Sequence, residues 1–311
     1  MNHTTILVPL DGSSFSEQSL PVALGLGRTL GASVQVATVA VGSAPAVPHG
    51  DAWCSPEALT AATEAASQYL SRVGQKIAQA TNVPLQGELL LPSPSGEGVG
   101  HVIVDYIDKS TPDLVVMSTH GRGPLSRAWV GSVASWVVHH TAAPLLLVRP
   151  GADGNVVFDD THRFHHILIP LDGSEEAETS LAWAKRIGRP SGATYTLVRV
   201  APRSFPAWSP YVRIPDVDVR DYAEAARAES LEYLRGVQGQ LESEGLVVTS
   251  VVDDSDSTAG GILHQAEERS ADLVVITTHG RSRLPRLILG SVADKVVRAS
   301  CVPVLVVRHH A

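Results

Sequence analysis

A glycine-rich segment that could bind phosphate occurs twice in this chain of 311 residues. Residues 119–134 read THGRGPLSRAWVGSVA, and residues 278–293 read THGRSRLPRLILGSVA. In both, a His-Gly pair is followed, after nine residues, by a Gly-Ser pair that opens an apolar run. Glycine has no Cβ, so the backbone can approach a ligand closely, and a helix that begins at the serine offers unpaired N–H groups and its positive dipole end. Phosphate is the ligand that we expect this segment to bind.

Several polar side chains of the segment recur in both copies. The serine of the Gly-Ser pair could form a hydrogen bond with a phosphate oxygen or cap its helix. In the second copy, Asp294 would complete a capping box with this serine. The two arginines could meet phosphate oxygens or acidic partners, or could lie on a solvated surface. The histidine of the His-Gly pair is more often a residue that packs within a loop. These residues are His120, Arg122, Arg127 and Ser132 in the first copy, and His279, Arg281, Arg286 and Ser291 in the second.

An aspartate follows the first apolar run of each half. Residues 6–13 read ILVPLDGS and residues 167–174 read ILIPLDGS, which places Asp11 and Asp172 at equivalent positions. In an open α/β fold these residues would stand at the carboxyl end of a parallel sheet, where ligands bind. The carboxylate could accept hydrogen bonds from ribose hydroxyls or hold Mg²⁺, or it could be a turn residue of the Asp-Gly-Ser sequence.

The elements that must position these residues follow from the hydrophobic pattern. Short β-branched runs alternate with longer helical patterns, which is typical of βαβ units around a parallel sheet. A helix is expected after the first strand of each half, from a capping box of Ser14 and Glu17 to Gly31 in the first and from a Ser174 cap in the second. The first half is expected to have strands at 4–10, 33–40, 85–91, 113–118 and 144–149, and long helices are expected near 57–80 and 217–243 with their apolar stripes toward the core.

The repeat predicts two domains, 1–150 and 163–311, joined by a linker at 151–162. Lys plus Arg number 7 against 11 Asp plus Glu in residues 1–155, and 17 against 21 in residues 156–311, so each half has a net charge of −4. Neither half has the basic excess of a nucleic-acid binder. No apolar run approaches the roughly 18 residues of a membrane span, and the start has no basic n-region. We therefore expect a cytoplasmic protein with neither nucleic acid nor membrane as a partner.

Other chemistries fit the sequence less well. It has no GxxxxGK[ST] motif and no GxSxG nucleophile elbow, so we expect no catalytic residues and no enzyme; slow ATP hydrolysis is possible but not indicated. Cys54 and Cys301 lack ligand spacing, and side chains of adjacent histidines diverge, so we expect no dedicated metal ligands. The run Asp253-Asp254-Ser255-Asp256 is expected to be a solvated loop, with Mg²⁺ binding or repulsion of phosphate as the alternatives.

The repeated motifs make the chain resemble a tandem universal stress protein. The resemblance rests on the VPLDGS and IPLDGS starts, the two THGR...GSVA segments, and the closing strands APLLLVRP and VPVLVVRH, and it covers nearly all of the chain. It implies an α/β fold of two tandem Rossmann-like (adenine nucleotide alpha hydrolase-like) domains, each with a five-stranded parallel sheet in the order 3-2-1-4-5. It also implies that the closing strands pair across a two-fold axis, which makes the two halves an internal pseudo-dimer. A separate homodimer of chains stays open.

The ATP-binding branch of this family carries Gly, two residues, Gly, nine residues, and then Gly-Ser or Gly-Thr. The resemblance places the second glycine at Gly121 and Gly280, and it assigns the aspartates to nucleotide contact and the backbone of Val39 and Val200 to adenine. The implied ATP contacts are Pro9, Asp11, Val39, Ser118, His120, Gly121, Arg122, Arg127, Gly131, Ser132 and Val133 in domain 1, and Pro170, Asp172, Val200, Thr277, His279, Gly280, Arg281, Arg286, Gly290, Ser291 and Val292 in domain 2.

One departure falls at the first glycine of the pattern. Ser118 and Thr277 stand there, so a small hydroxyl side chain could crowd the ribose or could add a hydrogen bond. The expected function is a nucleotide-dependent stress-response regulator that binds ATP, with Mg²⁺ held through the phosphates, and that acts on an unidentified protein partner. The alternative is an interaction scaffold of the same fold that binds no nucleotide.

Overall fold

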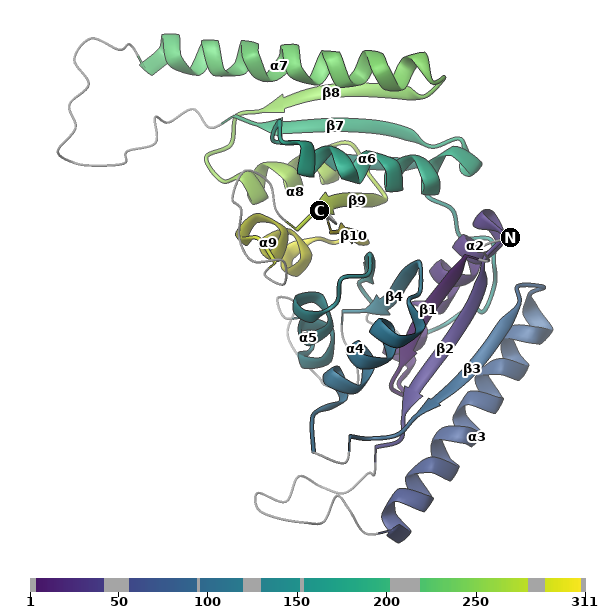
Figure 1. The fold of residues 1–311 in the computed structure, drawn as a ribbon. Coiled ribbons are helices and arrows are strands. Elements are labelled where there is room, and N and C mark those ends of the chain that lie inside the picture. Colours follow the sequence, from purple (N-terminus) through teal and green to yellow (C-terminus); the bar gives the residue numbers. More distant parts are fainter. Residues whose placement is uncertain are drawn as a thin grey trace, which may run out of the picture. The chain divides into compact units, whose positions relative to one another are not determined.

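The computed structural model describes residues 4–41, 56–93, 96–119, 130–151, 154–201, 219–278 and 289–308. The chain divides into two compact units, Met1–Arg163 and Phe164–Ala311. Each unit is a parallel β-sheet flanked by helices; in Figure 1, α3 runs beside β3 in the first unit and α7 runs beside β8 in the second. The α/β fold class predicted from the sequence is confirmed.

The first unit alternates strands and helices along the chain. Its strands pair in parallel in the spatial order β3-β2-β1-β4-β5, which is 3-2-1-4-5 in chain order. The elements are β1 (Thr5–Leu10), α1 (Ser14–Glu17), α2 (Leu20–Leu30), β2 (Ser33–Val39), α3 (Pro56–Ala80), β3 (Leu85–Leu90), α4 (Val99–Ser110), β4 (Leu114–Ser118), α5 (Ser132–His140) and β5 (Leu145–Val148).

The second unit repeats this architecture. Its strands pair in parallel in the order β8-β7-β6-β9-β10. The elements are β6 (His166–Pro170), α6 (Glu175–Gly188), the 3₁₀ turn η2 (Arg189–Ser191), β7 (Thr194–Val200), α7 (Val219–Ser243), β8 (Val247–Asp253), α8 (Thr258–Glu268), β9 (Leu273–Thr277), α9 (Ser291–Ala299) and β10 (Val304–Val307).

The central strands of both sheets are buried on both faces, as their continuous apolar sequences require. All five residues of β4 and all five of β9 are buried. An aspartate just before each of these strands fixes the start of its neighbour: the Asp113 carboxylate accepts the N–H of Thr5 at 2.8 Å, and the Asp272 carboxylate accepts the N–H of His166 at 3.0 Å. The repeated Asp-Leu-Val-Val sequence therefore sets the register of the two central strands in each unit.

The first helix of the first unit differs from the sequence prediction. A continuous helix to Gly31 was expected, but the chain forms the short α1 and then α2, with Pro21 at the start of α2. Proline has no N–H for an intrahelical bond and is best tolerated in the first turn, so the helix restarts there. The second unit has Ala182 at the equivalent position, and α6 is continuous. The cap is also corrected: Ser13, not Ser14, accepts the N–H of Ser16, whereas Ser174 caps α6 as predicted.

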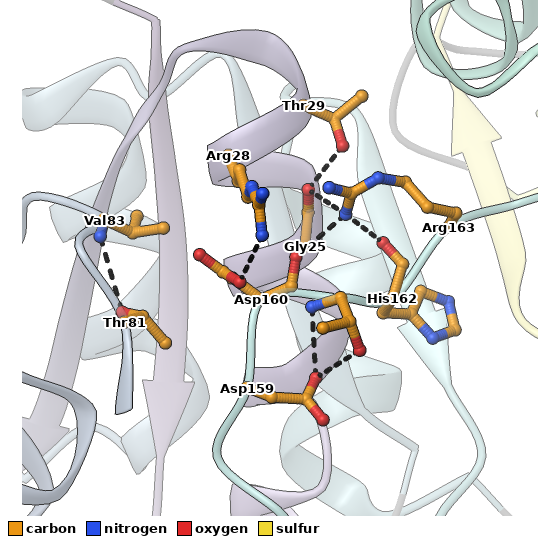
Figure 2. Close-up of polar contacts among 10 residues, drawn as sticks. Gly25, Arg28, Thr29, Thr81, Val83, Asp159, Asp160, His162 and Arg163 are labelled. Carbon is orange, nitrogen blue, oxygen red and sulfur yellow. Dashed lines mark hydrogen bonds and ion pairs between the residues drawn. The ribbon is translucent and has the colours of Figure 1, made fainter. Parts of the chain in front are cut away.

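Residues 160–163, at the end of the segment that connects the two units, lie against α2 in the first unit (Figure 2). The guanidinium of Arg163 donates to the carbonyl oxygens of Gly25 (3.2 Å), Asp160 (2.8 Å) and His162 (2.7 Å). Asp160 also forms an ion pair with Arg28 at 3.0 Å. A Cβ on Gly25 would lie 2.3 Å from the carbonyl oxygen of His162. Glycine at this position therefore allows the connecting segment to pack directly on the helix.

Candidate functional site

The candidate site of each unit lies where the chain order of neighbouring strands reverses. In the first unit β1 pairs with β2 on one side and with β4 on the other. In the second unit β6 pairs in the same way with β7 and β9. Loops after two such strands leave in opposite directions and open a crevice at the carboxyl ends of the strands, which is where open α/β sheets bind ligands.

A helix start faces this edge in both units. Gly131 is the N-cap of α5, and its N–H donates to the carbonyl oxygen of Thr119, just after β4, at 2.7 Å. Gly290 is the N-cap of α9, and its N–H donates to the carbonyl oxygen of Thr278 at 2.8 Å. The same backbone hydrogen bond therefore ties each helix start to the end of a central strand.

Neither of these helices has a side-chain cap in the described part of the chain, which bears on one of the two roles considered for the serines. Ser132 and Ser291 are the first helical residues and are exposed, so the N-cap reading is wrong. The capping box with Asp294 is also wrong, because the Asp294 carboxylate binds Arg298 at 2.9 Å, one turn along the helix. A helix start without a side-chain cap keeps first-turn N–H groups available for an anion.

The two aspartates hold the turn that begins the site. Asp11 Oδ1 accepts the N–H of Ser13 at 2.9 Å and its hydroxyl at 2.6 Å. Asp172 Oδ1 accepts the same two groups of Ser174 at 3.0 and 2.6 Å. The glycine between them has a φ of 83° at Gly12 and 88° at Gly173, which favours glycine. The turn role is thus observed in both units, and a carboxylate offers about four acceptor positions, so this role is compatible with a further bond to a ligand.

The remaining described site residues lie at the same edge. Val39 and Val200 end β2 and β7, and Pro9 and Pro170 lie at or beside the ends of β1 and β6. Ser118 and Thr277, at the position of the first motif glycine, end β4 and β9 and are only 7% and 8% exposed. Val133 and Val292 are the second residues of α5 and α9. His120, Gly121, Arg122 and Arg127, and their counterparts His279, Gly280, Arg281 and Arg286, lie outside the described residues.

Two tyrosines that the sequence analysis did not consider as site residues lie close enough to carboxylates for their pKa values to be affected. Burial raises the pKa of Tyr69 in α3, and the carboxylates of Glu17 and Asp11 raise it further. Burial likewise raises the pKa of Tyr233 in α7, as does its hydrogen bond to Glu178 at 2.8 Å. Tyr69 falls within the apolar stripe of its helix, so the sequence pattern indicates only a core residue.

The acidic run of the second half is not simply a solvated loop. Asp253 ends β8 and is only 6% exposed. Its carboxylate accepts the N–H of Ser255 at 2.9 Å and the amide of Gln265 at 3.0 Å, and lies 3.5 Å from His264 Nδ1. Burial alone would raise the pKa of Asp253, but these hydrogen bonds outweigh burial and hold the pKa below its ordinary value. The expectation of a solvated loop is therefore wrong for Asp253.

Several described side chains of the types that can ligate a metal are in hydrogen-bonding contact with other protein groups. The Gln265 amide nitrogen donates to Asp253 at 3.0 Å and to Glu268 at 3.1 Å, and thereby joins two carboxylates beside His264. Nδ1 of His139 lies 2.6 Å from the Ser135 carbonyl oxygen, and Nδ1 of His140 lies 2.8 Å from that of Trp136. Over the described part of the chain, no group of three or more His, Cys, Asp or Glu residues is arranged to hold a metal ion.

These observations define the class of protein: two tandem, doubly wound α/β domains, each with a glycine-capped helix start and an Asp-Gly-Ser turn at its switch point. The model of the universal stress protein family matches residues 2–149 and 163–308. The chain therefore belongs to the universal stress protein family and contains two domains of it. No helix among the described residues is long and apolar enough to cross a membrane.

Known relatives agree with this assignment. Universal stress proteins of Mycobacterium bovis and Mycobacterium tuberculosis are each 32% identical to this chain over 198 residues, which is 63% of this chain and 62% of the relative. The match thus spans less than two thirds of the length of these curated relatives. The crystal structure of a universal stress protein from Archaeoglobus fulgidus has the same fold, with a TM-score of 0.66 and 20% identity over 100% of both chains.

Proposed function

We propose that each domain binds ATP at the carboxyl edge of its sheet, and that the tandem protein is a nucleotide-dependent regulator in the stress response. The observation that carries this proposal is the helix start that both domains keep. Gly131 and Gly290 have the same cap position and the same hydrogen bond to the end of the central strand, and neither helix has a side-chain cap hydrogen bond among the described residues. Such a start suits the phosphates of a nucleotide, because N–H groups and the helix dipole both favour an anion.

The other residues of the edge suit the rest of the nucleotide. Asp11 and Asp172 supply a carboxylate beside the switch point, which can accept a ribose hydroxyl. The ends of β2 and β7, at Val39 and Val200, supply backbone groups for adenine. Ser118 and Thr277, at the first motif position, are largely covered by protein, so only a small part of each side chain is left to meet a ligand.

The proposal assigns binding and signalling to the protein, with Mg²⁺ held through the ATP phosphates. ATP occupancy would change the surface that the loops around the site present to a protein partner. Pairing of the two closing strands across a two-fold axis stays a prediction, and so do the cytoplasmic location and a homodimer of chains.

The proposal is tested by nucleotide content and by stoichiometry. The purified protein is denatured, and the supernatant is analysed by chromatography for adenine nucleotides; stripped protein is then titrated with Mg-ATP by calorimetry. We expect released adenine nucleotide, or a titration with two ATP per chain. Protein that releases no nucleotide and gives no heat with Mg-ATP would favour the interaction scaffold instead.

A further inference from the structure

The strand β3 forms the outer edge of the sheet in the first domain. It pairs with β2, and the N–H of Val34 donates to the carbonyl oxygen of Pro84 at 2.8 Å, just before β3 begins. Because backbone groups alternate in direction along a strand, Leu85, Gly87 and Leu89 turn their N–H and C=O groups to the outer edge. Gly87 is exposed, and the two leucines are half-buried. An edge with accessible backbone groups can pair with a further strand.

The second domain covers the same edge with side chains of α7. At the positions of the two outward-facing leucines, β8 has Val248 and Val252. The amide of Gln238 donates to the carbonyl oxygen of Val248 at 3.2 Å, and the guanidinium of Arg227 donates to that of Val252 at 3.4 Å. Two outward-facing carbonyl groups of β8 are therefore bonded within the domain.

The helix beside β3 lacks both of these donors. When α3 and α7 are aligned by their buried residues, α3 has Gly74 at the position of Gln238 and Thr63 at the position of Arg227. Glycine has no side chain, and the hydroxyl of Thr63 donates to the carbonyl oxygen of Leu59 within its own helix at 2.8 Å. These two positions of α3 therefore leave the outer edge of β3 uncovered.

A cavity of about 370 Å³ lies between α3 and this edge, and two glycines, Gly74 and Gly87, line it. In the second domain Ser250 stands at the position of Gly87, and its hydroxyl donates to the carbonyl oxygen of Leu234 in α7 at 3.3 Å. Side chains thus occupy, in the second domain, the two positions that glycines hold in the first. The lining of the cavity also includes Val36 and Leu85 from the sheet, Leu70 and Ala78 from α3, and the polar Thr81 and Asn82.

The two faces of the edge differ in character. A Cβ on Gly87 would lie 3.9 Å from the Cβ of Leu70, so this position faces α3 and the cavity. Glu88 is the next residue and turns to the opposite face, because side chains alternate along a strand. Directly opposite residues of paired strands share a face. An incoming strand therefore meets an apolar cavity on one face and a carboxylate on the other, so a segment in which apolar and basic residues alternate fits this edge.

We propose that the outer edge of β3 binds an extended segment of a protein partner, which adds a strand to the sheet, places an apolar side chain in the cavity and places a basic side chain beside Glu88. Backbone hydrogen bonds to Leu85, Gly87 and Leu89 supply affinity, and the cavity and the carboxylate supply specificity. The surface belongs to the first domain, because α7 covers the equivalent edge of the second. The inference does not depend on ATP binding.

The test titrates the full chain by calorimetry with a peptide in which valine and lysine alternate, Ac-TVKVKVS-NH2. One control peptide has glutamate in place of lysine, and another has N-methyl groups on its central residues and cannot donate hydrogen bonds to β3. Gly74→Gln puts the residue of the second domain over the edge. Its Cβ would lie 3.9 Å from Leu85 Cδ2, which is an ordinary contact, and glutamine favours a helix more than glycine does.

Gly239→Gln is the matched control variant. It makes the same exchange on an exposed part of α7, where no atom lies within 4 Å of the added Cβ. Far-UV circular dichroism and thermal melting check the fold of both variants. Sedimentation of the free chain measures self-association, and a separate titration with Mg-ATP measures nucleotide binding.

We expect one valine-lysine peptide to bind per chain, Gly74→Gln to weaken its binding more than about tenfold, and Gly239→Gln to change it less than about twofold. The glutamate peptide should bind about tenfold more weakly, and the N-methylated peptide should give only heat of dilution. The titration with Mg-ATP should be the same in both variants as in the wild-type protein.

Wild-type protein that takes up none of the valine-lysine peptide would overturn this proposal, and so would an unchanged peptide affinity in Gly74→Gln. A wild-type dimer that Gly74→Gln dissociates, without any uptake of peptide, would also overturn it and would assign the edge to a second copy of the chain. Each of these outcomes leaves the proposed ATP binding untouched, because nucleotide is titrated separately.

Discussion

The two domains keep the same backbone at the candidate site but different side chains around it. Both have the Asp-Gly-Ser turn and the glycine cap, with matching hydrogen bonds. At the paired ends of the second and third strands, the first domain has Thr38 and Leu90, whereas the second has Arg199 and Asp253. The difference teaches that the two domains share the backbone geometry of the turn and the helix start, while the side chains at the ends of their second and third strands differ.

The largest expected effect tests what the domains share. Gly131→Val and Gly290→Val each add a branched side chain where the phosphates approach, so each should lower ATP affinity at its own site more than about 100-fold. Calorimetry should find one ATP per chain in either single variant and none in the double variant, with unchanged helix content. Gly98→Val is the matched control, because Gly98 also caps a helix and no atom lies within 4 Å of its added Cβ. Unchanged affinity in the double variant would refute the phosphate site.

The next effect tests the close packing of the connecting segment on Gly25 in the first domain. The second domain has an arginine at the equivalent position. Gly25→Ala should lower the free energy of unfolding by about 1–3 kcal/mol, because the new Cβ would lie 2.3 Å from the His162 carbonyl oxygen. The equivalent residue in the second domain is Arg186, whose guanidinium lies 4.8 Å from the Trp183 ring. Arg186→Ala should cost less than about 1 kcal/mol. Urea unfolding measures both, and a stabilised Gly25→Ala variant would show that the segment does not pack on α2.

A smaller effect concerns acid stability, which should distinguish the domains. Because the pKa of Asp253 is lower in the folded chain than its ordinary value, its ionised form stabilises the second domain above about pH 4. This stability is lost as the pH falls through the folded pKa. Hydrogen exchange of second-domain peptides between pH 3 and pH 6, followed by mass spectrometry with correction for intrinsic rates, should detect the loss.

Asp253→Asn is the informative variant for this prediction. It removes the titrating group, so the second domain should be less stable at pH 6 and should lose its acid-dependent difference from the first domain, which has Leu90 there. Asp256→Asn, at an exposed position, serves as the control. An unchanged acid profile in Asp253→Asn would assign the effect to other carboxylates.

The smallest effect is expected at the ion pair between Arg28 and Asp160. Arg28 is 57% exposed on its side chain, so Arg28→Ala should change the free energy of unfolding by less than about 1 kcal/mol. The connecting segment would then depend on backbone packing at Gly25 more than on this pair. Thermal melts of Arg28→Ala and the wild-type protein at low and high salt measure the difference in stability. A large loss of stability in Arg28→Ala that appears only at low salt would show that the ion pair contributes more than the packing at Gly25.

Much of the fold could be predicted from local patterns. The repeated motifs identified two α/β halves, and the β-branched runs located strands such as Leu114–Ser118 within a residue or two. The break between α1 and α2 was missed because Pro21 lies inside an otherwise helical pattern, and the sequence does not show where the helix restarts. Ser13 was overlooked as a cap because adjacent serines are indistinguishable by spacing alone.

Side-chain roles at the site were less predictable than its position. The Asp-Gly-Ser turn and the Gly-Ser helix start are local, so both candidate roles of Asp11 and Ser132 could be stated in advance. The roles of Asp253 and Tyr69 depend on residues far away in sequence: Gln265 in α8 for the first, and Glu17 in α1 for the second. From the sequence alone, the charged run at 253–256 therefore suggested a solvated loop, and the apolar stripe of α3 suggested only a core face.

The sequence by itself determined the duplication, the α/β class, and the glycines and aspartates at the ends of strands, because these follow from periodicity and from the backbone geometry that glycine and aspartate favour. Only the tertiary structure decided which polar groups are already satisfied. It commits the Asp253 carboxylate to Gln265 and the Tyr233 hydroxyl to Glu178. Burial and hydrogen bonding arise from segments that meet only in the folded chain, and spacing along one segment does not contain that information.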